Sequence, residues 1–230
     1  MISANELNYY KKNGYVVINN FFSKSKIDKI RLEILSLAKK KNNDHFYYEN
    51  LGKQKVLRRI ERISQNSAKM NKILKDIKLK ITLKQLTGLK SYLFKDKLNF
   101  KFPGAGGFDP HIDGHFLWKN KDNKIKKGWS VYGKKFINVV IPLEKSFLGS
   151  SWSEISNKLV KFTPKIKSKF LKKVKFRPMI LNQGDVMFFD WKVMHHSKKN
   201  LSKKSRMIFY ATYINSKESK ANVIKKYYLV

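Results

Sequence analysis

Hydrophobic residues recur at helical spacing through much of residues 1–90. A short helix is predicted over 6–12, ended by Asn13-Gly14, and the apolar residues 15–18 predict a strand. A capping box at 25–28 predicts the start of the next helix. The inward face of that helix carries Ile27, Ile30, Ile34, Leu35 and Ala38. Another one-sided helix is predicted over 67–86, so this part of the chain is expected to be mainly helical.

From residue 91 onward the pattern changes to short apolar or aromatic runs separated by turn residues. Strands at this spacing predict an all-β barrel or sandwich with helices packed outside it. Gly184-Asp185 between two apolar runs predicts a turn. The lysine-rich segments 119–135 and 146–175 are weakly periodic and are expected to be loops or lids, with a helix inside 153–173 as an alternative.

These patterns predict one domain. No repeat and no Gly-, Ser- or Pro-rich linker divides the chain, and 230 residues suit a single core. We expect a mainly helical part over 1–90, a barrel core over 91–215 and a C-terminal tail over 216–230.

Lysine dominates the charge of the chain. Lys and Arg total 51 against 16 Asp and Glu, a formal net charge of +35, and only six of the basic residues are Arg. Such a charge attracts nucleic acids and other anions. Arg, however, is the residue that binds phosphate through two parallel hydrogen bonds. Because the lysines are spread along nearly every segment, we interpret much of the excess as compositional bias on solvated faces.

The residues that the chain lacks restrict its chemistry. It has no cysteine, which excludes disulfides, iron–sulfur clusters and thiol catalysis and leaves His, Asp and Glu as metal ligands. The first residues do not form a basic-then-apolar leader, and no apolar run of about 18 residues is present for a membrane span. We therefore expect a soluble, cytoplasmic protein.

Candidate metal ligands lie in the segment FDPHIDGHF. His111 and Asp113 are two residues apart in a strand-like run, so their side chains project from the same face. A histidine from a neighbouring strand would complete a face of two imidazoles and one carboxylate, which leaves three positions on Fe(II) open for a chelating cosubstrate and O2. The pattern His-x-Asp also occurs by chance, so this spacing is a weak signal by itself.

The distal part of the chain strengthens the metal hypothesis. The run GDVMFFD leads to His195-His196, and Arg206 opens the apolar strand RMIFYATY. We predict a hairpin that pairs the His195 strand with the Arg206 strand, with residues 202–205 as its turn. The guanidinium would then lie deep in the barrel and could hold the far carboxylate of a dicarboxylate whose near end chelates iron.

At this point the sequence resembles the phytanoyl-CoA dioxygenase-like family of Fe(II)- and 2-oxoglutarate-dependent oxygenases. The resemblance spans most of the chain. It includes NELNYYKKNGYVVINNFFSKSKIDKIR, LNFKFPGAGGFDPHIDGHF and GDVMFFDWKVMHHSKKNLSKKSR. In the last block the family pattern has a His followed by Ser two, Asn five and Arg eleven residues later. His195, Ser197, Asn200 and Arg206 fill these positions.

The resemblance implies a role for each matching residue. His111, Asp113 and His195 would bind iron. Arg206, assisted by the Ser197 hydroxyl, would hold the C5 carboxylate of 2-oxoglutarate, whose other end chelates the metal. Matches to further family positions place Asn99 at 2-oxoglutarate and His115 near the substrate.

The remaining histidines and two departures from the family pattern leave alternatives open. His196 competes with His195 as the third ligand; the offsets to Asn200 and Arg206 favour His195, and adjacent strand residues face opposite sides. His45, in a polar run, is interpreted as a surface or loop histidine. The segment LGSSWSEISNK stands where the family commonly has Pro-Gly-Ser-His, with Asn157 near the expected histidine, and Val140 replaces a frequent aromatic. Both departures concern the substrate pocket.

The predicted fold is therefore mainly β with flanking α, a double-stranded β-helix with N-terminal helices packed outside. The resemblance implies oxidative decarboxylation of 2-oxoglutarate with Fe(II) and O2, coupled to hydroxylation of an unactivated C–H bond; the carboxylate of Asp113 disfavours halogenation. Ascorbate is expected to stimulate turnover in vitro. We expect a small-molecule substrate, with anionic compounds as a candidate class, and no pattern indicates an oligomeric state. The alternatives are a basic nucleic-acid-binding protein and a non-catalytic ligand-binding barrel.

Overall fold

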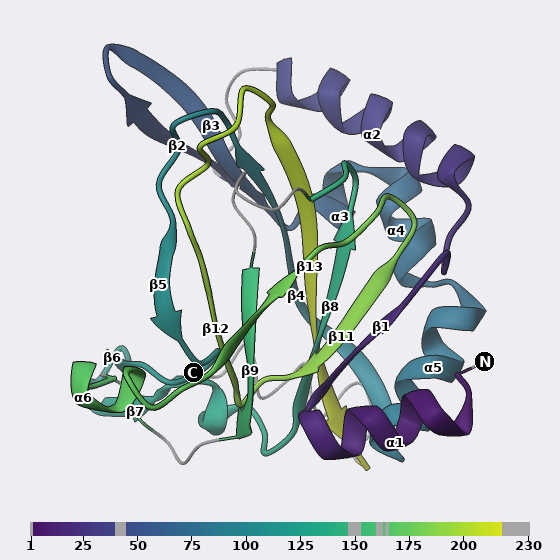
Figure 1. Cartoon of the computed structure of the whole chain (residues 1–230), viewed down its shortest axis with the longest axis vertical. Helices are drawn as coiled ribbons and strands as arrows, with labels where there is room; N and C mark the ends of the chain where they lie inside the picture. The colour runs from purple at the N-terminus through teal and green to yellow at the C-terminus, as the bar shows by residue number, and fades with distance from the viewer. Residues whose placement is uncertain (1, 40–44, 147–152, 160–162, 164–165, 218–230) are drawn as a thin grey trace.

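Helices dominate the N-terminal part of the computed structural model, which describes residues 2–39, 45–146, 153–159, 163 and 166–217 (Figure 1). The helices among the described residues are α1 (Ala4–Asn13), α2 (Lys24–Lys39), α3 (Ile63–Asn66), α4 (Ala68–Leu74), α5 (Ile77–Thr87), α6 (Ser168–Leu171) and the 3₁₀ turn η1 (Gly128–Val131). The strands are β1 (Tyr15–Ile18), β2 (Phe46–Leu51), β3 (Gln54–Glu61), β4 (Lys90–Lys101), β5 (Phe108–His111), β6 (Leu117–Lys119), β7 (Ile125–Lys127), β8 (Phe136–Pro142), β9 (Ser153–Leu159), β10 (Phe176–Met179), β11 (Val186–Asp190), β12 (Val193–Ser197) and β13 (Arg206–Ser216).

Two antiparallel sheets form the barrel. The larger has the strand order β1-β11-β8-β13-β4-β3-β2, and the smaller has the order β10-β9-β12-β5. Helices α2 to α5 cover the outer face of the larger sheet, and the smaller sheet lies against its other face (Figure 1). Strands β6 and β7 form a separate two-stranded sheet, at the lower left of Figure 1. Two facing antiparallel sheets are the arrangement expected of a double-stranded β-helix.

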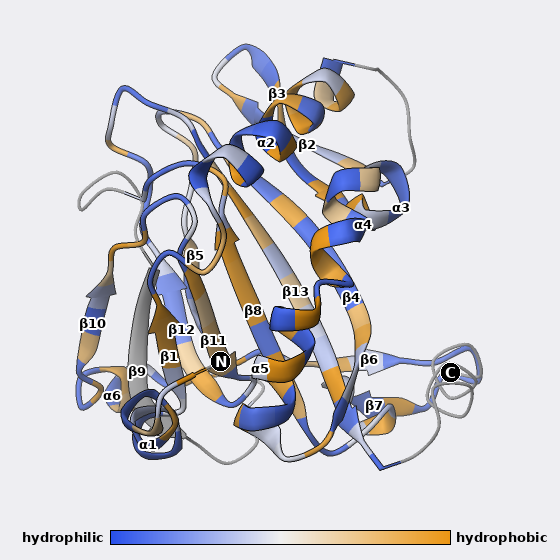
Figure 2. Cartoon of the chain, turned by 90° about the vertical axis from the view of Figure 1, so that its right-hand side faces the viewer, coloured by the Kyte–Doolittle hydropathy of each residue, from blue (hydrophilic) through white to orange (hydrophobic). Residues whose placement is uncertain are grey.

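The alternation of side chains along the central strands explains this layering. Along β8 and β13, one set of residues packs against the helices in a large apolar core that includes Ile137, Val139, Ile141, Phe209 and Ala211. The intervening residues face the barrel interior, where Val140, Ile208 and Tyr210 join a second cluster with Phe189 of β11. Figure 2 shows the apolar character of these strands. Strands that are buried on both faces must carry apolar residues on both faces, which accounts for the near-continuous run in β8.

Two predictions about the helices need correction. Helix α2 begins before the predicted capping box, because the hydroxyl of Ser23 accepts the hydrogen bond from the backbone N–H of Lys26 at 3.3 Å. The helix predicted over 67–86 is two helices, α4 and α5. The side chain of Asp76 caps α5 by accepting from the N–H of Lys78 at 2.9 Å, and this cap allows the chain to turn between the two helices.

The sequence patterns also missed several strands. The β2–β3 hairpin extends the larger sheet within the part expected to be mainly helical. Strand β9, expected to be loop, is central in the smaller sheet and pairs with β10 and β12. Within the other lysine-rich segment, β7 pairs with β6. The predicted turn at Gly184-Asp185 is confirmed, with Gly184 at a φ of 97°. Residues 218–230 of the expected tail lie outside the described residues.

The predicted hairpin between the His195 and Arg206 strands is wrong. Strand β12 belongs to the smaller sheet and β13 to the larger one, so the chain crosses the barrel between them. Asn200, which is fully buried, organises this crossing. Its amide donates to the carbonyls of Lys101 and Lys204, each at 2.9 Å, and its side-chain oxygen accepts from Ser202. His195 and Arg206 therefore lie on facing walls of the barrel, and residues 202–205 belong to the crossing.

Candidate active site

The structure brings three potential metal ligands together between the ends of β5 and β12. Atoms of His111, Asp113 and His195 that can bind a metal all lie within 4.8 Å of one another. His111 and His195 are cross-strand partners, with ring centroids 4.4 Å apart. Asp113 follows the end of β5, just before Gly114 turns the chain with a φ of 73°. A residue with a side chain in place of Gly114 would meet the ring of Trp191.

Backbone carbonyls set the orientation of both imidazoles. Nδ1 of His111 lies 2.7 Å from the carbonyl oxygen of Asp109, and Nδ1 of His195 lies 3.0 Å from that of Val193. Each Nδ1 therefore carries the proton, which leaves the lone pair of Nε2 available to a metal. Nε2 of His195 lies 3.8 Å from Oδ2 of Asp113, too far for a direct hydrogen bond and suited to an ion between them.

A chain of hydrogen bonds from the larger sheet orients Asp113. The amide of Asn138 on β8 donates to Oδ2 of Asp113 at 2.9 Å. The hydroxyl of Thr212 on β13 donates to the side-chain oxygen of Asn138 at 2.7 Å, so the Asn138 nitrogen must face Asp113. Such support from residues behind a ligand fixes the position of a metal-binding carboxylate.

The electrostatic environment keeps Asp113 and His195 in the protonation states that metal binding requires. Burial by itself raises the pKa of Asp113, but the positive potential of His195, His111 and the nearby lysines outweighs it, and the pKa lies below its usual value. Burial, followed by repulsion from His111, lowers the pKa of His195 to about 4. Asp113 is thus ionised and His195 neutral around neutral pH.

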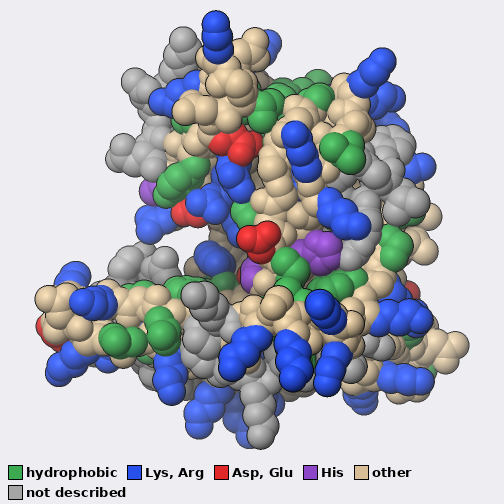
Figure 3. Space-filling model, turned by 60° about the vertical axis from the view of Figure 1, so that its left-hand side comes forward, with side chains coloured by type: hydrophobic (Ala, Val, Ile, Leu, Met, Phe, Trp, Pro, Cys, Tyr) green, Lys and Arg blue, Asp and Glu red, His purple; other side chains and the backbone are tan. Residues whose placement is uncertain are grey.

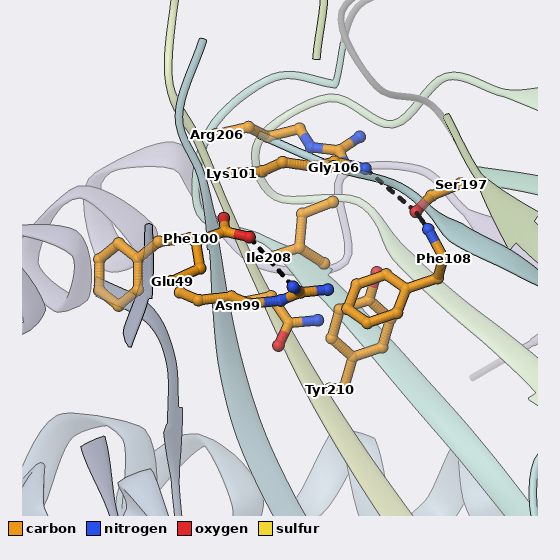
Figure 4. Close-up of a pocket in the computed structure, with 11 residues that line it drawn as sticks. Glu49, Asn99, Phe100, Lys101, Gly106, Phe108, Ser197, Arg206, Ile208 and Tyr210 are labelled. Carbon is orange, nitrogen blue, oxygen red and sulfur yellow. Dashed lines mark hydrogen bonds and ion pairs between the residues drawn. The ribbon is translucent and has the colours of Figure 1, made fainter. Parts of the chain in front are cut away.

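A second pocket lies around Arg206 (Figure 4). Arg206 is only 5% exposed, and it donates from Nη1 to the hydroxyl of Ser146 at 3.0 Å. Its Nε has no hydrogen-bond partner, and no described acidic residue forms an ion pair with it. A buried guanidinium with an unused donor is an incomplete site, and a carboxylate would complete it.

Lys101 adds a second buried positive charge to this pocket. Its Nζ donates to the Ser197 hydroxyl at 3.1 Å, and that hydroxyl also accepts from the backbone N–H of Phe108 at 3.2 Å. Burial, with repulsion from Arg206 and Arg58, lowers the pKa of Lys101 to about 7. Ser197 therefore lines the Arg206 pocket but contacts Lys101 and Phe108 in the described structure (Figure 4).

The triad and the Arg206 pocket are continuous. Asn99, Phe108, Ser197 and Tyr210 line both spaces. The side-chain oxygen of Asn99 is buried without a hydrogen-bond partner, and rotation of the amide would present its nitrogen as a donor instead. Figure 3 shows a hollow in the surface with histidine side chains beside it and both basic and acidic side chains around it.

Three other residues singled out in the sequence take different positions. His196 lines the pocket of the triad but packs edge-on against the ring of Phe176, with centroids 4.6 Å apart, and is not part of the clustered ligand atoms. His115 is buried against Trp191, and its Nδ1 accepts from the backbone N–H of Thr163 at 3.1 Å. Burial and the charge of Lys192 lower the pKa of His115. His45 immediately precedes β2, away from the pockets. The side chain of Asn157 lies outside the described residues.

Sequence reasoning missed several residues of this site: Lys95, Lys97, Lys101, Asn138, Ser146, Tyr210 and Thr212. The three lysines alternate with buried residues on β4 and share the inward face with Asn99. Because every second residue of a strand lies on the same face, counting in steps of two from Asn99 would have identified them. Ser146 follows no such pattern. Its contact with Arg206 joins positions 60 residues apart, and only the folded chain reveals it.

The sequence profile of the phytanoyl-CoA dioxygenase (PhyH) family matches residues 10–146 and 158–208. These ranges contain every residue of the triad and Arg206, and they cover most of the chain. The chain belongs to the phytanoyl-CoA dioxygenase family.

Curated relatives of this PhyH-family chain are dioxygenases. The dioxygenase lolE1 of Epichloe uncinata is 24% identical over 230 aligned residues, which span 92% of this chain and 82% of that protein. The 2-aminoethylphosphonate dioxygenase of uncultured bacterium HF130_AEPn_1 is 27% identical over 137 residues, 56% of this chain and 48% of that protein.

Solved structures share the fold. EctD from S. alaskensis, crystallised with 2-oxoglutarate and 5-hydroxyectoine, matches with a TM-score of 0.80 at 18% identity, over 94% of this chain and 76% of that one. AviO1 from Streptomyces viridochromogenes Tue57 matches with a TM-score of 0.77 at 15% identity, over 94% and 96% of the two chains. The double-stranded β-helix predicted from the sequence is confirmed. Family and relatives together support a 2-oxoglutarate-dependent dioxygenase, an oxidoreductase.

Proposed function

We propose that this protein binds Fe(II) through His111, Asp113 and His195 and hydroxylates an unactivated C–H bond of a small, anionic substrate. The observation that carries the proposal is the pairing of two incomplete sites in one continuous space. Ligand atoms of the triad lie within 4.8 Å of one another, and the buried Arg206 lacks a carboxylate partner among the described residues. An iron-chelating dicarboxylate fits both sites at once.

The donor set suits iron(II). Two imidazoles and one carboxylate would hold the ion and leave positions open for a cosubstrate and O2. Arg206 would hold the C5 carboxylate of 2-oxoglutarate, with Ser146 fixing the guanidinium and Ser197, Lys101 and Asn99 nearby.

The chemistry that the bound group supplies is oxidation by O2. With iron(II) present, O2 oxidises 2-oxoglutarate to succinate and CO2, and its second oxygen atom enters the C–H bond of the substrate. The protein residues position the reactants and exclude water. Phe189 packs edge-on against His195 with centroids 5.0 Å apart, and Val140, Leu181 and Ile208 form the adjoining apolar wall. Asp113 would supply the carboxylate ligand to the iron, which favours hydroxylation over halogenation.

The first test measures succinate formed from 2-oxoglutarate in the presence of Fe(II), O2 and ascorbate. We expect the wild-type protein to form succinate even without its substrate. His195→Ala should abolish this turnover and weaken Fe(II) binding at least tenfold, since one of three ligands is lost. His196→Ala should reduce turnover by less than tenfold, and His45→Ala serves as the control outside the pockets. If His196→Ala loses succinate formation and Fe(II) binding while His195→Ala keeps both, His196 rather than His195 is the third ligand.

Substrate identification follows from the same assay. The protein, loaded with Fe(II) and 2-oxoglutarate, would be incubated with metabolite mixtures and screened for products that gain one oxygen atom. The relative named 2-aminoethylphosphonate dioxygenase makes 2-aminoethylphosphonate one compound to include.

No helix in the described part of the chain is both long and apolar enough to cross a membrane. A cytoplasmic location stays a prediction.

A further inference from the structure

Two lysines of β4 point into the barrel beside the triad. Lys95 and Lys97 line the same pocket as His111, Asp113 and His195. Their cross-strand partners on β13 are Thr212 and Tyr210, which also line this pocket. The strand alternation that turns Leu98 into the apolar core therefore directs these two ammonium groups toward the candidate metal centre.

No carboxylate in the described ranges forms an ion pair with Lys95 or Lys97. Glu61, the cross-strand neighbour of Lys97 on β3, forms its ion pair with Arg59 at 3.2 Å. The close contacts of the two lysines are aromatic: Nζ of Lys95 lies 4.1 Å from the ring centroid of Trp129, and Nζ of Lys97 lies 5.7 Å from that of Tyr210. Burial disfavours the charged form of both lysines, whereas Asp113 and Glu61 favour it.

A charge inventory of the loaded site shows what is missing. Two positive charges of iron(II) and one of Arg206 balance Asp113 and the two carboxylates of 2-oxoglutarate. Arg58 pairs with Glu49, Arg59 pairs with Glu61, and Lys101, with a pKa of about 7, carries only part of a charge at neutral pH. The charges of Lys95 and Lys97 then remain without an ion-pair partner among the described residues, and both side chains are partly buried. Two such cations are costly unless an anion accompanies them.

The anion that would compensate them is distinct from the C5 carboxylate of 2-oxoglutarate. Lys101 is the cross-strand partner of Arg206, whereas Lys95 lies six residues away along β4. At strand spacing this places the Lys95 backbone about 20 Å from that of Lys101. A five-carbon dicarboxylate held by Arg206 and the triad does not extend past the triad to Lys95.

We propose that Lys95 and Lys97 form the site for an anionic group of the substrate, a carboxylate or a phosphonate. The inference rests on the proposed function, and it defines the substrate class: a small molecule whose anion lies between two ammonium groups and whose C–H bond lies beside the iron. Trp129 and Tyr210 hold the lysine side chains in place through cation–π contacts. Each ammonium acts as a point charge, so the site accepts planar and tetrahedral anions alike.

The test compares anionic and neutral probes of similar size. The protein, loaded with Fe(II) and saturating 2-oxoglutarate without O2, is titrated calorimetrically with butyrate, ethylphosphonate and the neutral amide butyramide. We expect at least one anion to bind at least tenfold more tightly than butyramide. Lys95→Met and Lys97→Met, which retain an unbranched apolar side chain, should each reduce that preference at least tenfold. Lys90→Met, at an exposed position of the same strand, should leave it unchanged.

Any other result either contradicts the assignment of Lys95 and Lys97 as an anion site or separates that site from the proposed reaction. If both anions bind no more tightly than butyramide to the wild-type protein, no anion site is present. If the methionine variants fold and keep the preference, or lose 2-oxoglutarate affinity instead, the lysines have another role. Lys95→Arg and Lys97→Arg keep the charge and should keep the preference, which tests the site even where methionine destabilises the fold. Anion preference without succinate formation would reject the proposed reaction and leave the anion site standing.

Discussion

Arg206 is the main charged side chain of the proposed cosubstrate pocket. It brings a permanent charge into the barrel. There its Nη1 donates to the Ser146 hydroxyl, and its Nε has no hydrogen-bond partner. A buried polar atom without a partner is rare in folded proteins and commonly marks a binding function. The side chain is therefore better suited to binding a carboxylate than to stabilising the free protein.

Replacing this guanidinium should separate cosubstrate binding from metal binding. Arg206→Ala should raise the KM for 2-oxoglutarate at least tenfold, because a charge-assisted, two-pronged contact is lost. The KM of Arg206→Lys should lie between those of Arg206→Ala and the wild type, since lysine provides the charge without the two parallel hydrogen bonds of a guanidinium. Fe(II) affinity, measured by equilibrium binding, should change by less than twofold.

A second readout excludes general damage. Excess 2-oxoglutarate should raise the melting temperature of the wild-type protein and of Arg177→Ala, an exposed control, but not that of Arg206→Ala. If cosubstrate affinity and the melting shift both survive in Arg206→Ala, Arg206 does not hold the C5 carboxylate.

The crossing between β12 and β13 determines how His195 and Arg206 are placed relative to each other. It connects the two sheets, and Asn200 replaces the backbone pairing that a hairpin would have provided. Gly107 assists nearby, because a side chain there would collide with the carbonyl oxygen of Ser197. The close approach holds β5 against β12, where His111 meets His195.

Loss of the Asn200 side chain should loosen this crossing. Asn200→Ala removes the amide that donates to the carbonyls of Lys101 and Lys204, of which only that of Lys204 keeps another side-chain donor, the Ser202 hydroxyl. This loss should lower the free energy of unfolding by about 1–3 kcal/mol. The KM for 2-oxoglutarate should rise as well, because Arg206 lies at the end of the crossing. Urea denaturation and succinate kinetics measure the two effects.

Asn50→Ala provides the matched control. Asn50 is exposed on β2, and its replacement should change stability by no more than about 0.5 kcal/mol. Equal effects of the two substitutions would show that the side-chain bonds of Asn200 do not stabilise the crossing.

Charge is distributed unevenly between the surface and the interior of the protein. Most lysines among the described residues are at least partly exposed, whereas Lys101 is 6% exposed and its pKa is lowered to about 7 by burial and by Arg206 and Arg58. The net charge of +35 therefore says little about function, while a few inward lysines matter for it. Stability of the whole fold should reflect this buried charge.

The free energy of unfolding of the metal-free protein should rise with pH above 7. Between pH 7 and 10.5 the unfolded chain keeps the proton of Lys101 while the folded protein releases it, so the unfolded state binds more protons and stability increases with pH. Lys101→Met removes this contribution. The stability advantage of the variant over the wild type should shrink by about 2 kcal/mol from pH 7 to pH 9.

Urea denaturation at the two pH values measures this difference. Lys90→Met, which removes an exposed charge from the same strand, should show the same pH dependence as the wild type. A constant difference between Lys101→Met and the wild type would mean that Lys101 titrates as it does in the unfolded chain.

Local patterns predicted much of the barrel and of the site. His111, Asp113, His195 and Arg206 follow from spacing and family resemblance, and the structure places all four around one space. The hairpin prediction failed because residues 198–205 are as short as a hairpin loop, yet they span two sheets. Strand β9 was missed because its pairing with β10 and β12 is made by backbone groups, which leave no strong periodicity in SEISNKL.

Short-range information thus accounts for residue types, strand faces and the choice of candidate ligands, because side-chain periodicity and motif offsets act within a few residues. The partners of those side chains required the folded chain. Asn138 and Thr212 behind Asp113, Ser146 beside Arg206, and Lys95 and Lys97 beside the triad come from strands and loops far apart in the sequence. Contacts between such distant positions depend on sheet order and register, which long-range packing decides.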